Sequence, residues 1–282
     1  MKKVLVTGGV GFIGSNLIQS LISKGYEVYS IDDYSSGSLK NELAEVKYIK
    51  MNILNISDLN ETFDICFHLA ARTLVQESFE RVDDYFSSNV SGTLNIAKWA
   101  SKNNIKLIYA GSASKHNNPR SSPYALTKFL GEEICKLYKL NFKLDLQIAR
   151  FYNVYGRREI LDGEYAAVVG KWRTQIDEGK PITIVGDGEQ KRDFTHVDDI
   201  VTGLFLIGMK RESHPDAWEL GTGVNYSINK VYEMFKERFN CDKVYTPDEA
   251  GNYRATLRIN NDAIERLGWK PTDSLYDYIR VL

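Results

Sequence analysis

The segment from Val4 to Gly14, VLVTGGVGFIG, most strongly constrains what this chain can fold into. Its first apolar residues predict a buried strand, and the glycines at positions 8, 9, 11 and 14 let the backbone turn directly into a helix. Such a turn brings free N–H groups and the positive end of the helix dipole together, where they can bind a pyrophosphate. A side chain at Gly11 or Gly14 would block the phosphate or the packing of helix on strand. The segment therefore predicts a dinucleotide site rather than an ordinary strand-to-helix turn.

Strand-like and helical patterns alternate through the first half of the chain. Six apolar runs predict strands, at residues 3–7, 26–31, 46–50, 63–68, 105–109 and 144–149. Apolar residues at helical spacing predict helices between them, at residues 12–23, 83–101 and 122–140. This alternation is typical of an α/β fold with a Rossmann-type, doubly wound parallel sheet.

The pattern becomes less regular after Arg150. We expect residues 1–150 to form the Rossmann-type domain that binds the dinucleotide and residues 151–282 to form a smaller C-terminal substrate-binding lobe. Residues 197–210 include a helical stretch at 197–209 and are expected to return to the first domain.

The composition excludes several classes of function. The 282 residues include 36 Lys and Arg and 37 Asp and Glu, so the overall charge favours neither nucleic acid nor an anionic membrane as a partner. Cys66, Cys135 and Cys241 are odd in number and far apart, and neither they nor the four histidines show metal-ligand spacing. No stretch is long enough to span a bilayer. We expect a cytoplasmic protein without a bound metal.

Two acidic residues, Asp32 and Asp33, follow the second predicted strand, the first of them eighteen residues after Gly14. A carboxylate at this place accepts hydrogen bonds from the hydroxyls of an adenosine ribose. Two carboxylates would repel a 2′-phosphate, and no arginine follows immediately to bind one, so the sequence favours NAD over NADP.

Ser112 and the segment Tyr124-Ala-Leu-Thr-Lys128 predict an acid/base catalyst. A tyrosine and a lysine at i and i+4 lie on one helix face, so the Lys128 ammonium can lie near the Tyr124 phenol or near a bound ribose. Lowering a phenol pKa from about 10 to about 7 requires roughly 4 kcal/mol, which an ammonium and an oxidised nicotinamide could supply jointly in a partly dry site. Ser112 follows a strand at the carboxyl edge of the sheet, where its hydroxyl can bond to a reacting alcohol.

The helices predicted at 83–101 and 122–140 are more apolar than packing on one sheet face usually requires. Pairing of these helices across a homodimer would explain the excess, and burial within one subunit would explain it equally well. The sequence leaves both alternatives open.

The chain resembles the extended short-chain dehydrogenase/reductase family of NAD-dependent nucleotide-sugar epimerases and dehydratases over nearly its whole length. Six motifs carry the resemblance: TGGVGFIG at 7–14, HLAA at 68–71, NVSGT at 89–93, PYALTK at 123–128, RFYNVYG at 150–156 and RDFTHVDD at 192–199. Three segments are most similar to bacterial UDP-N-acetylhexosamine 4-epimerases, at residues 150–159, 164–173 and 186–194.

The resemblance implies roles for individual residues. Ser112, Tyr124 and Lys128 would be the catalytic residues. NAD contacts are implied for Gly8, Gly11, Phe12, Ile13, Gly14, Asp32, Asp33, Asn52, Ile53, Leu69, Ala70, Ala71, Asn89, Tyr124, Lys128 and Tyr152. Substrate contacts are implied for Ser112, Ser114, Asn153, Arg192 and Thr256. Asn153 and Arg192 would hold the diphosphate, and the small Thr256 would leave room for an N-acetyl group on the sugar.

The chain also departs from the family pattern. Ala113 stands where dehydratases and decarboxylases of the family carry an acid, and Glu249 stands where a diphosphate-binding arginine is common, with Arg254 as the only nearby replacement. The segment between Ser112 and Tyr124 is short and contains His116. The resemblance implies an NAD-dependent UDP-sugar 4-epimerase acting through a transient 4-keto sugar, with a homodimer as the expected assembly. A sugar-nucleotide 4-ketoreductase or dehydratase is the alternative enzyme, and an NAD-binding regulatory module is the alternative without catalysis.

Overall fold

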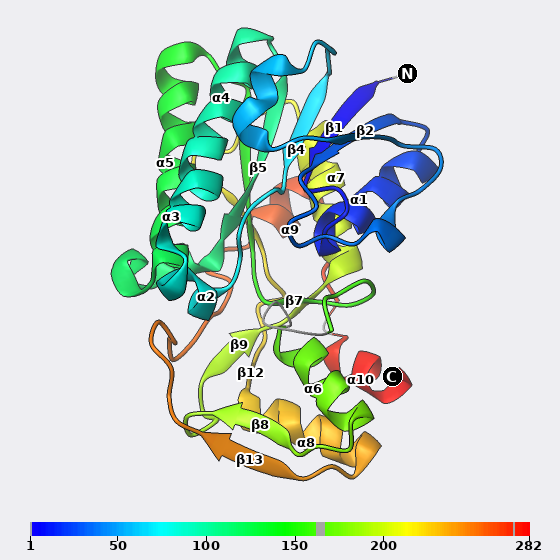
Figure 1. Cartoon of the computed structure of the whole chain (residues 1–282), viewed down its shortest axis with the longest axis vertical. Coiled ribbons are helices and arrows are strands. Elements are labelled where there is room, and N and C mark those ends of the chain that lie inside the picture. Colours follow the sequence, from blue (N-terminus) through cyan, green and yellow to red (C-terminus); the bar gives the residue numbers. More distant parts are fainter. Residues whose placement is uncertain (1, 162–166, 273) are drawn as a thin grey trace.

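The computed structural model describes residues 2–161, 167–272 and 274–282 (Figure 1). Figure 1 shows a larger lobe built on a central sheet and a smaller lobe below it. Residues 164–166, which begin one of the motifs most similar to the UDP-N-acetylhexosamine epimerases, lie outside the described residues.

Seven parallel strands form the central sheet, in the order β11-β6-β5-β4-β1-β2-β3. They are β1 (Lys3–Thr7), β2 (Glu27–Asp32), β3 (Lys47–Lys50), β4 (Ile65–His68), β5 (Lys106–Ser112), β6 (Leu146–Phe151) and β11 (Trp218–Leu220). The Rossmann-type doubly wound fold is confirmed. The strand order reverses between β1 and β4, and this reversal opens a crevice at the carboxyl ends of the strands.

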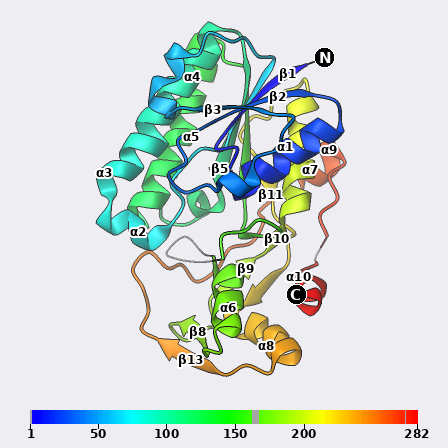
Figure 2. The same cartoon turned by 45° about the vertical axis from the view of Figure 1, so that its right-hand side comes forward.

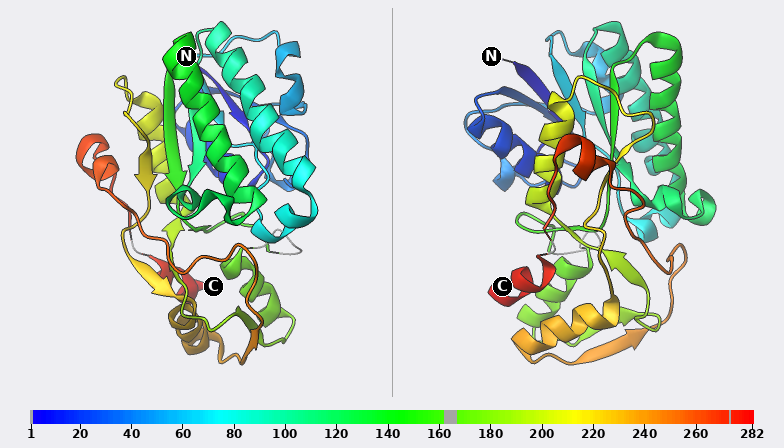
Figure 3. Two further views of the ribbon diagram at one scale, coloured as in Figure 1. Left: turned by 90° about the vertical axis from the view of Figure 1, so that its left-hand side faces the viewer. Right: turned by 180° about the vertical axis from the view of Figure 1, so that it is seen from behind.

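Helices cover both faces of the sheet (Figures 2 and 3). One face carries α1 (Phe12–Ser23), α7 (Val197–Met209) and α9 (Asp262–Leu267), and the other carries α4 (Thr93–Lys102) and α5 (Pro123–Phe142). The apolar residues alternate along each strand, so Val4 and Val6 pack under α1 and α7, whereas Leu5 packs under α4.

The helix predicted at 83–101 is divided into three segments. They are α3 (Val82–Tyr85), the π-helical η3 (Phe86–Gly92) and α4. The wider turns of η3 carry Asn89, whose side chain bonds to the backbone of Arg72 after β4. A polar contact to a neighbouring segment therefore accompanies the irregular helix that apolar spacing alone does not predict.

The chain returns to the larger lobe after residue 196, and the return is longer than expected. α7 packs against α1, β11 then pairs with β6, and Ala263 of α9 and Trp269 join the same apolar core. The division of the chain at residue 150 stays a prediction, because parts of the second half complete the sheet of the first.

The smaller lobe holds α6 (Val168–Asp177), α8 (Ile228–Phe239) and α10 (Leu275–Val281) around its own core, which includes Trp172 and Phe235. Its strands form three short pairs, β7 (Val154–Tyr155) with β10 (Thr195–His196), β9 (Lys191–Asp193) with β12 (Asn225–Ser227), and β8 (Ile182–Val185) with β13 (Lys243–Thr246). Within the described ranges, no helix is both long and apolar enough to cross a membrane.

A buried ion cluster surrounds Arg150 at the end of β6. Its guanidinium donates to Glu132 of α5 at 2.8 Å, to Glu219 of β11 at 2.8 Å and to Asp216 at 2.8 Å. The side chains of Arg150, Glu132 and Glu219 are at most 1% exposed. The cluster therefore joins a helix and two strands by charge in the interior of the protein.

We expect Arg150→Ala to lower the free energy of unfolding by about 3 to 5 kcal/mol, because Glu132 and Glu219 lose the buried cation that they share, and their remaining basic neighbours, Lys115 and His116, are partly exposed. Urea denaturation of full-length protein measures this difference. Lys180→Ala removes an ion pair with Glu178 whose side chains are 65% and 48% exposed, so it serves as the control and should cost about 0 to 1 kcal/mol. Equal losses in the two variants would contradict the importance of the cluster.

Candidate active site

A cavity of about 520 Å³ lies at the carboxyl edge of the central sheet; we call it the first cavity. The glycine turn, the ends of β2, β4, β5 and β6, and the start of α5 all contribute to its wall. Every residue for which the sequence predicts an NAD contact lines this cavity, except Asn89. The topology therefore brings segments far apart in the sequence to one place.

The glycines of the turn differ in how closely other atoms approach the place where a Cβ would lie. A Cβ at Gly14 would lie 2.1 Å from the carbonyl oxygen of Gly8, so this glycine is required for packing of α1 against the turn. Gly8 has φ +74°, and a Cβ there would lie 2.8 Å from the backbone nitrogen of Ala70. Gly11, at the N-cap of α1, meets nothing closer than 3.2 Å and lines the cavity. No side chain caps the first turn of α1, so its N–H groups face the cavity without a side-chain acceptor.

Asp32 is held by the backbone at the end of β2. Its carboxylate accepts from Val10 N at 3.1 Å and from Tyr34 N at 2.9 Å. Burial raises the pKa of Asp32, and these two hydrogen bonds oppose the rise. Asp33 accepts from Asn52 Nδ2 at 2.9 Å, so the second acid is also fixed at the cavity wall.

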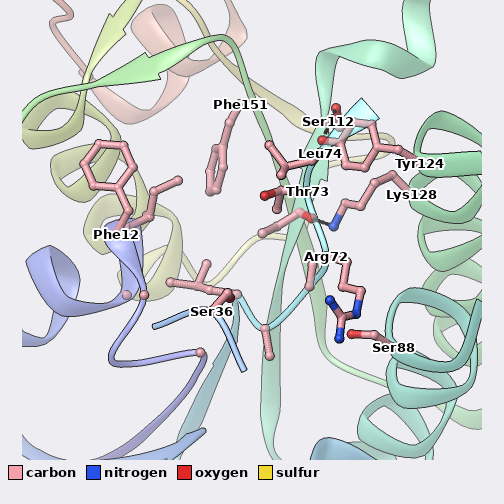
Figure 4. Close-up of a pocket in the computed structure, with 18 of the residues that line it drawn as sticks. Phe12, Ser36, Arg72, Thr73, Leu74, Ser88, Ser112, Tyr124, Lys128 and Phe151 are labelled. Carbon is pink, nitrogen blue, oxygen red and sulfur yellow. Dashed lines mark hydrogen bonds between the residues drawn. The ribbon is translucent and has the colours of Figure 1, made fainter. Parts of the chain in front are cut away.

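The sequence analysis missed several residues of the cavity wall. Ser35, Ser36 and Gly37 line it directly after the acidic pair, and small residues following Asp33 were the available signal. Arg72 and Ser88 line it as well, and Figure 4 shows them side by side beyond Lys128. No motif in the sequence pointed to these two.

The three predicted catalytic residues converge at one end of the first cavity (Figure 4). The hydroxyl of Tyr124 donates to Ser112 Oγ at 3.2 Å, and Lys128 Nζ donates to the carbonyl oxygen of Ala110 at 2.6 Å. Ser122 caps α5 by accepting from Ala125 N at 3.1 Å, which fixes the helix start beside the end of β5. The cap of α5 and the position of β5 together bring the Tyr124 hydroxyl within hydrogen-bonding distance of Ser112 Oγ.

Burial shifts the pKa values of Tyr124 and Lys128 in opposite directions. It raises the pKa of Tyr124 to about 12, with the hydrogen bond to Ser112 opposing the rise, and it lowers the pKa of Lys128 to about 8. A phenol with this pKa needs about 7 kcal/mol to ionise at neutral pH. The protein alone therefore leaves Tyr124 less ionised at neutral pH than a free phenol, and the two positive charges proposed from the sequence must supply more than the roughly 4 kcal/mol expected there.

Asn89 lies behind the cavity rather than in its wall. Its amide accepts from Arg72 N at 2.8 Å and donates to Arg72 O at 3.0 Å and to Thr127 Oγ1 at 3.1 Å. It holds the segment after β4 against α5, which supports the positioning role that the resemblance implies for Asn89, whereas its direct contact with NAD stays a prediction.

A second cavity of about 580 Å³ lies in the smaller lobe and adjoins the first. Arg192 lines it, and Asn153 lines both cavities. Six residues are common to both walls, Leu74, Val75, Asn153, Val154, Ala167 and Tyr253, and we call them the neck. A ligand that reaches from Arg192 to Tyr124 must pass the neck.

Two residues expected to contact the substrate, Ser114 and Thr256, lie behind side chains that line the cavity walls. Ser114 is buried and donates to Ser112 Oγ at 2.9 Å, and Thr256 is buried and accepts from Asn153 Nδ2 at 3.1 Å. Neither lines a cavity wall in this structure, so the substrate contacts expected for Ser114 and Thr256 stay predictions. Arg254 pairs with the exposed Asp187 at 2.9 Å and lines neither cavity, whereas Glu249 lines the second, so Arg254 does not replace the arginine absent at 249.

The family profile described as "NAD dependent epimerase/dehydratase family" matches residues 4–221. The chain belongs to this family. A UDP-glucuronate 4-epimerase of Thermodesulfobacterium geofontis is 31% identical over 311 residues, which cover 99% of this chain and 94% of that protein. A UDP-N-acetyl-alpha-D-glucosaminuronate decarboxylase of Bacillus cytotoxicus is 32% identical over 253 residues, covering 82% and 78%. A solved UDP-N-acetylglucosamine 4-epimerase from Methanobrevibacter ruminantium, in complex with UDP-N-acetylmuramic acid, has a TM-score of 0.89 and 29% identity, covering 99% and 96%.

The first cavity fits the cofactor of the NAD dependent epimerase/dehydratase family. The uncapped first turn of α1 suits a pyrophosphate, and Asp32 lies where an adenosine ribose would bind. Asp32 and Asp33 together oppose a 2′-phosphate, so NAD is the cofactor that these residues favour. Among the residues that the structure describes, no group of three or more His, Cys, Asp or Glu side chains is arranged to hold a metal ion.

Comparison with Lys128→Met tests the lowered pKa of this buried ammonium. Folded Lys128 loses its proton near pH 8, whereas the unfolded chain keeps it to about pH 10.5. Between these values the unfolded state binds more protons, so the stability of the wild type should rise with pH relative to that of the variant. Urea unfolding of both proteins without added cofactor, at about pH 7.5 and about pH 10, measures the effect. A stability difference that is the same at both pH values would contradict it.

Proposed function

We propose that this chain is an NAD-dependent UDP-sugar 4-epimerase. The observation that carries the proposal is the position of Tyr124, Ser112 and Lys128 at the end of the NAD-type cavity nearest the neck, beyond which Arg192 lines a second cavity. This arrangement suits a substrate with a reacting hydroxyl at one end and a diphosphate at the other. Similarity to a UDP-glucuronate 4-epimerase and to a UDP-N-acetylglucosamine 4-epimerase supports the same reaction.

The residues divide the chemistry between them. Tyr124 removes the proton from the sugar 4-hydroxyl, while Ser112 bonds to the same oxygen and keeps it in line with the phenol. The Lys128 ammonium, on the same helix face, stabilises the phenolate. Bound NAD supplies a reversible hydride acceptor for C4. A 4-keto sugar that turns over before it is reduced again gives the epimer.

The structure bears on the alternatives. Elimination of water needs an acid near the leaving hydroxyl, and the residues after Ser112 are Ala113 and Ser114, whose hydroxyl already bonds to Ser112. This disfavours a dehydratase. The phenol, serine and lysine are all present with hydrogen-bonding geometry, which disfavours a regulatory module without catalysis.

Incubation with UDP-glucose, UDP-galactose and their N-acetylated counterparts, with products analysed by NMR, tests the proposal. Wild-type protein with NAD should convert at least one pair in both directions without added NADH. Tyr124→Phe should lower kcat by about 100-fold or more, because the base is lost, while NAD binding measured by calorimetry is largely kept. Retention of most activity by Tyr124→Phe would contradict the mechanism.

We infer that the assembly is a homodimer formed through α4 and α5, and that the homodimer lies in the cytoplasm. The two helices lie side by side on the outside of the larger lobe (Figure 1). Leu94 of α4 is 40% exposed, and Leu137 and Leu140 of α5 are 51% and 81% exposed. Apolar surface therefore remains uncovered within one subunit, which favours the first of the two alternatives. Cys66 and Cys135 are free and buried, as is common in a reducing compartment.

Light scattering after size-exclusion chromatography should give twice the mass of the chain for wild-type protein. Replacing both Leu94 and Leu137 by Glu should give the monomer mass, because two charges would be buried at the interface. Leu39→Glu, at a site 70% exposed on another surface, is the matched control and should remain dimeric. A monomeric wild type would show that α4 and α5 do not form the interface.

A further inference from the structure

Tyr253 is the residue of the neck whose polar group is left free. It lines both cavities, and its hydroxyl forms no hydrogen bond with the residues that the structure describes. Asn153, the other neck residue with a polar side chain, already donates to Asp193 O and to Thr256 Oγ1, both at 3.1 Å. A phenol at the neck can therefore donate to a ligand, or accept from it, without breaking a bond within the protein.

The ring of Tyr253 is fixed by its neighbours. The guanidinium of Arg192 lies over its face, 4.6 Å from the ring centroid, and also donates to Asn252 Oδ1 at 2.6 Å. The ring and the cation that lines the second cavity are thus held as one unit.

The segment that carries Tyr253 is pressed against the larger lobe. Gln76 of α2 (Val75–Glu80) donates to Ala250 O at 3.0 Å. Gly251 has φ +77°, and a Cβ there would lie 2.8 Å from Val75 Cγ1 and 3.2 Å from Ser122 Cβ. Because Ser122 caps the helix that bears Tyr124, the two tyrosines are positioned against the same helix start.

The two phenols also act on each other electrostatically. Burial is the main cause of the raised pKa of Tyr124, and a negative charge on Tyr253 would add to it. Tyr253 lines the first cavity together with Tyr124 and Ser112, where the reacting oxygen is expected.

We propose that Tyr253 is a specificity-determining residue that contacts the hexose ring of the substrate. The inference rests on the proposed function. A sugar nucleotide carries its diphosphate on C1 and reacts at C4, across the ring. With the diphosphate at Arg192 and C4 at Tyr124, the hexose lies in the neck, where the Tyr253 hydroxyl bonds to a substituent on its edge and the ring limits its size. Tyr253 thus takes the position in the cavity wall that the sequence analysis assigned to Thr256.

Calorimetry in a Tyr124→Phe background tests the contact, because the sugar nucleotide then binds without turnover. Adding Tyr253→Phe removes the hydroxyl but keeps the ring over Arg192. The Kd of UDP-N-acetylglucosamine or of UDP-glucose should rise about threefold to tenfold, whereas the Kd of UDP should change less than about twofold. Tyr245→Phe, which removes an exposed hydroxyl bonded to Asn229 at 2.9 Å in the same lobe, is the matched control and should leave all three Kd values unchanged.

Adding Tyr253→Val to the same background separates the hydroxyl from the ring. It should alter the ratio of the Kd values of UDP-N-acetylglucosamine and UDP-glucose, since the neck is widened. Unchanged Kd values for both sugar nucleotides in both Tyr253 variants would overturn the inference, as would an equal loss of affinity for UDP. Failure of the Tyr124→Phe protein to bind any UDP-sugar would instead contradict the proposed function itself.

Discussion

The buried charge of Arg150 is the constraint on which the site depends. Its carboxylate partners come from α5, from β11 and from the segment before β11, and each partner lies close to a functional element. Glu132 is one helical turn beyond Lys128, and Glu219 accepts from Tyr152 at 2.6 Å in the wall of the first cavity. Such a cluster adds little net stability compared with apolar packing. Its effect is orientation, because the catalytic helix cannot shift along β6 without uncovering a charge.

The same cluster accounts for the short segment between Ser112 and Tyr124. Lys115 reaches Glu132 at 3.0 Å, and His116 reaches Glu219 at 2.9 Å. The carboxylates that bind Arg150 therefore also bind two residues of this segment, Lys115 and His116. A short connection suffices here because ionic contacts, rather than a longer loop, fix its path behind Ser112.

Sequence patterns predicted the elements that bury an apolar face and the motifs whose geometry is local. The helix at 12–23, the helix at 197–209 and the pair Tyr124 and Lys128 follow from spacing along one backbone segment. They could not predict β11, which has three residues and is a strand because it pairs with β6. Nor could they predict which side chains reach the cavity wall. Ser114 follows the cavity residue Ala113, and Thr256 lies three residues after Tyr253, but their hydroxyls bond to Ser112, Asn153 and the backbone of Asp193 in the interior.

The repeated return of the chain to the central sheet has a mechanical consequence. β6 leads into β7 of the smaller lobe, β10 leads back into α7, and β11 leads out again to β12 before α9 comes back. A rotation of the smaller lobe must therefore be accommodated by all of these connections together, because bending at one of them alone would strain the others. The connection from β6 to β7 runs through Tyr152 and Asn153, which line the first cavity, so any such rotation would also change the shape of that cavity.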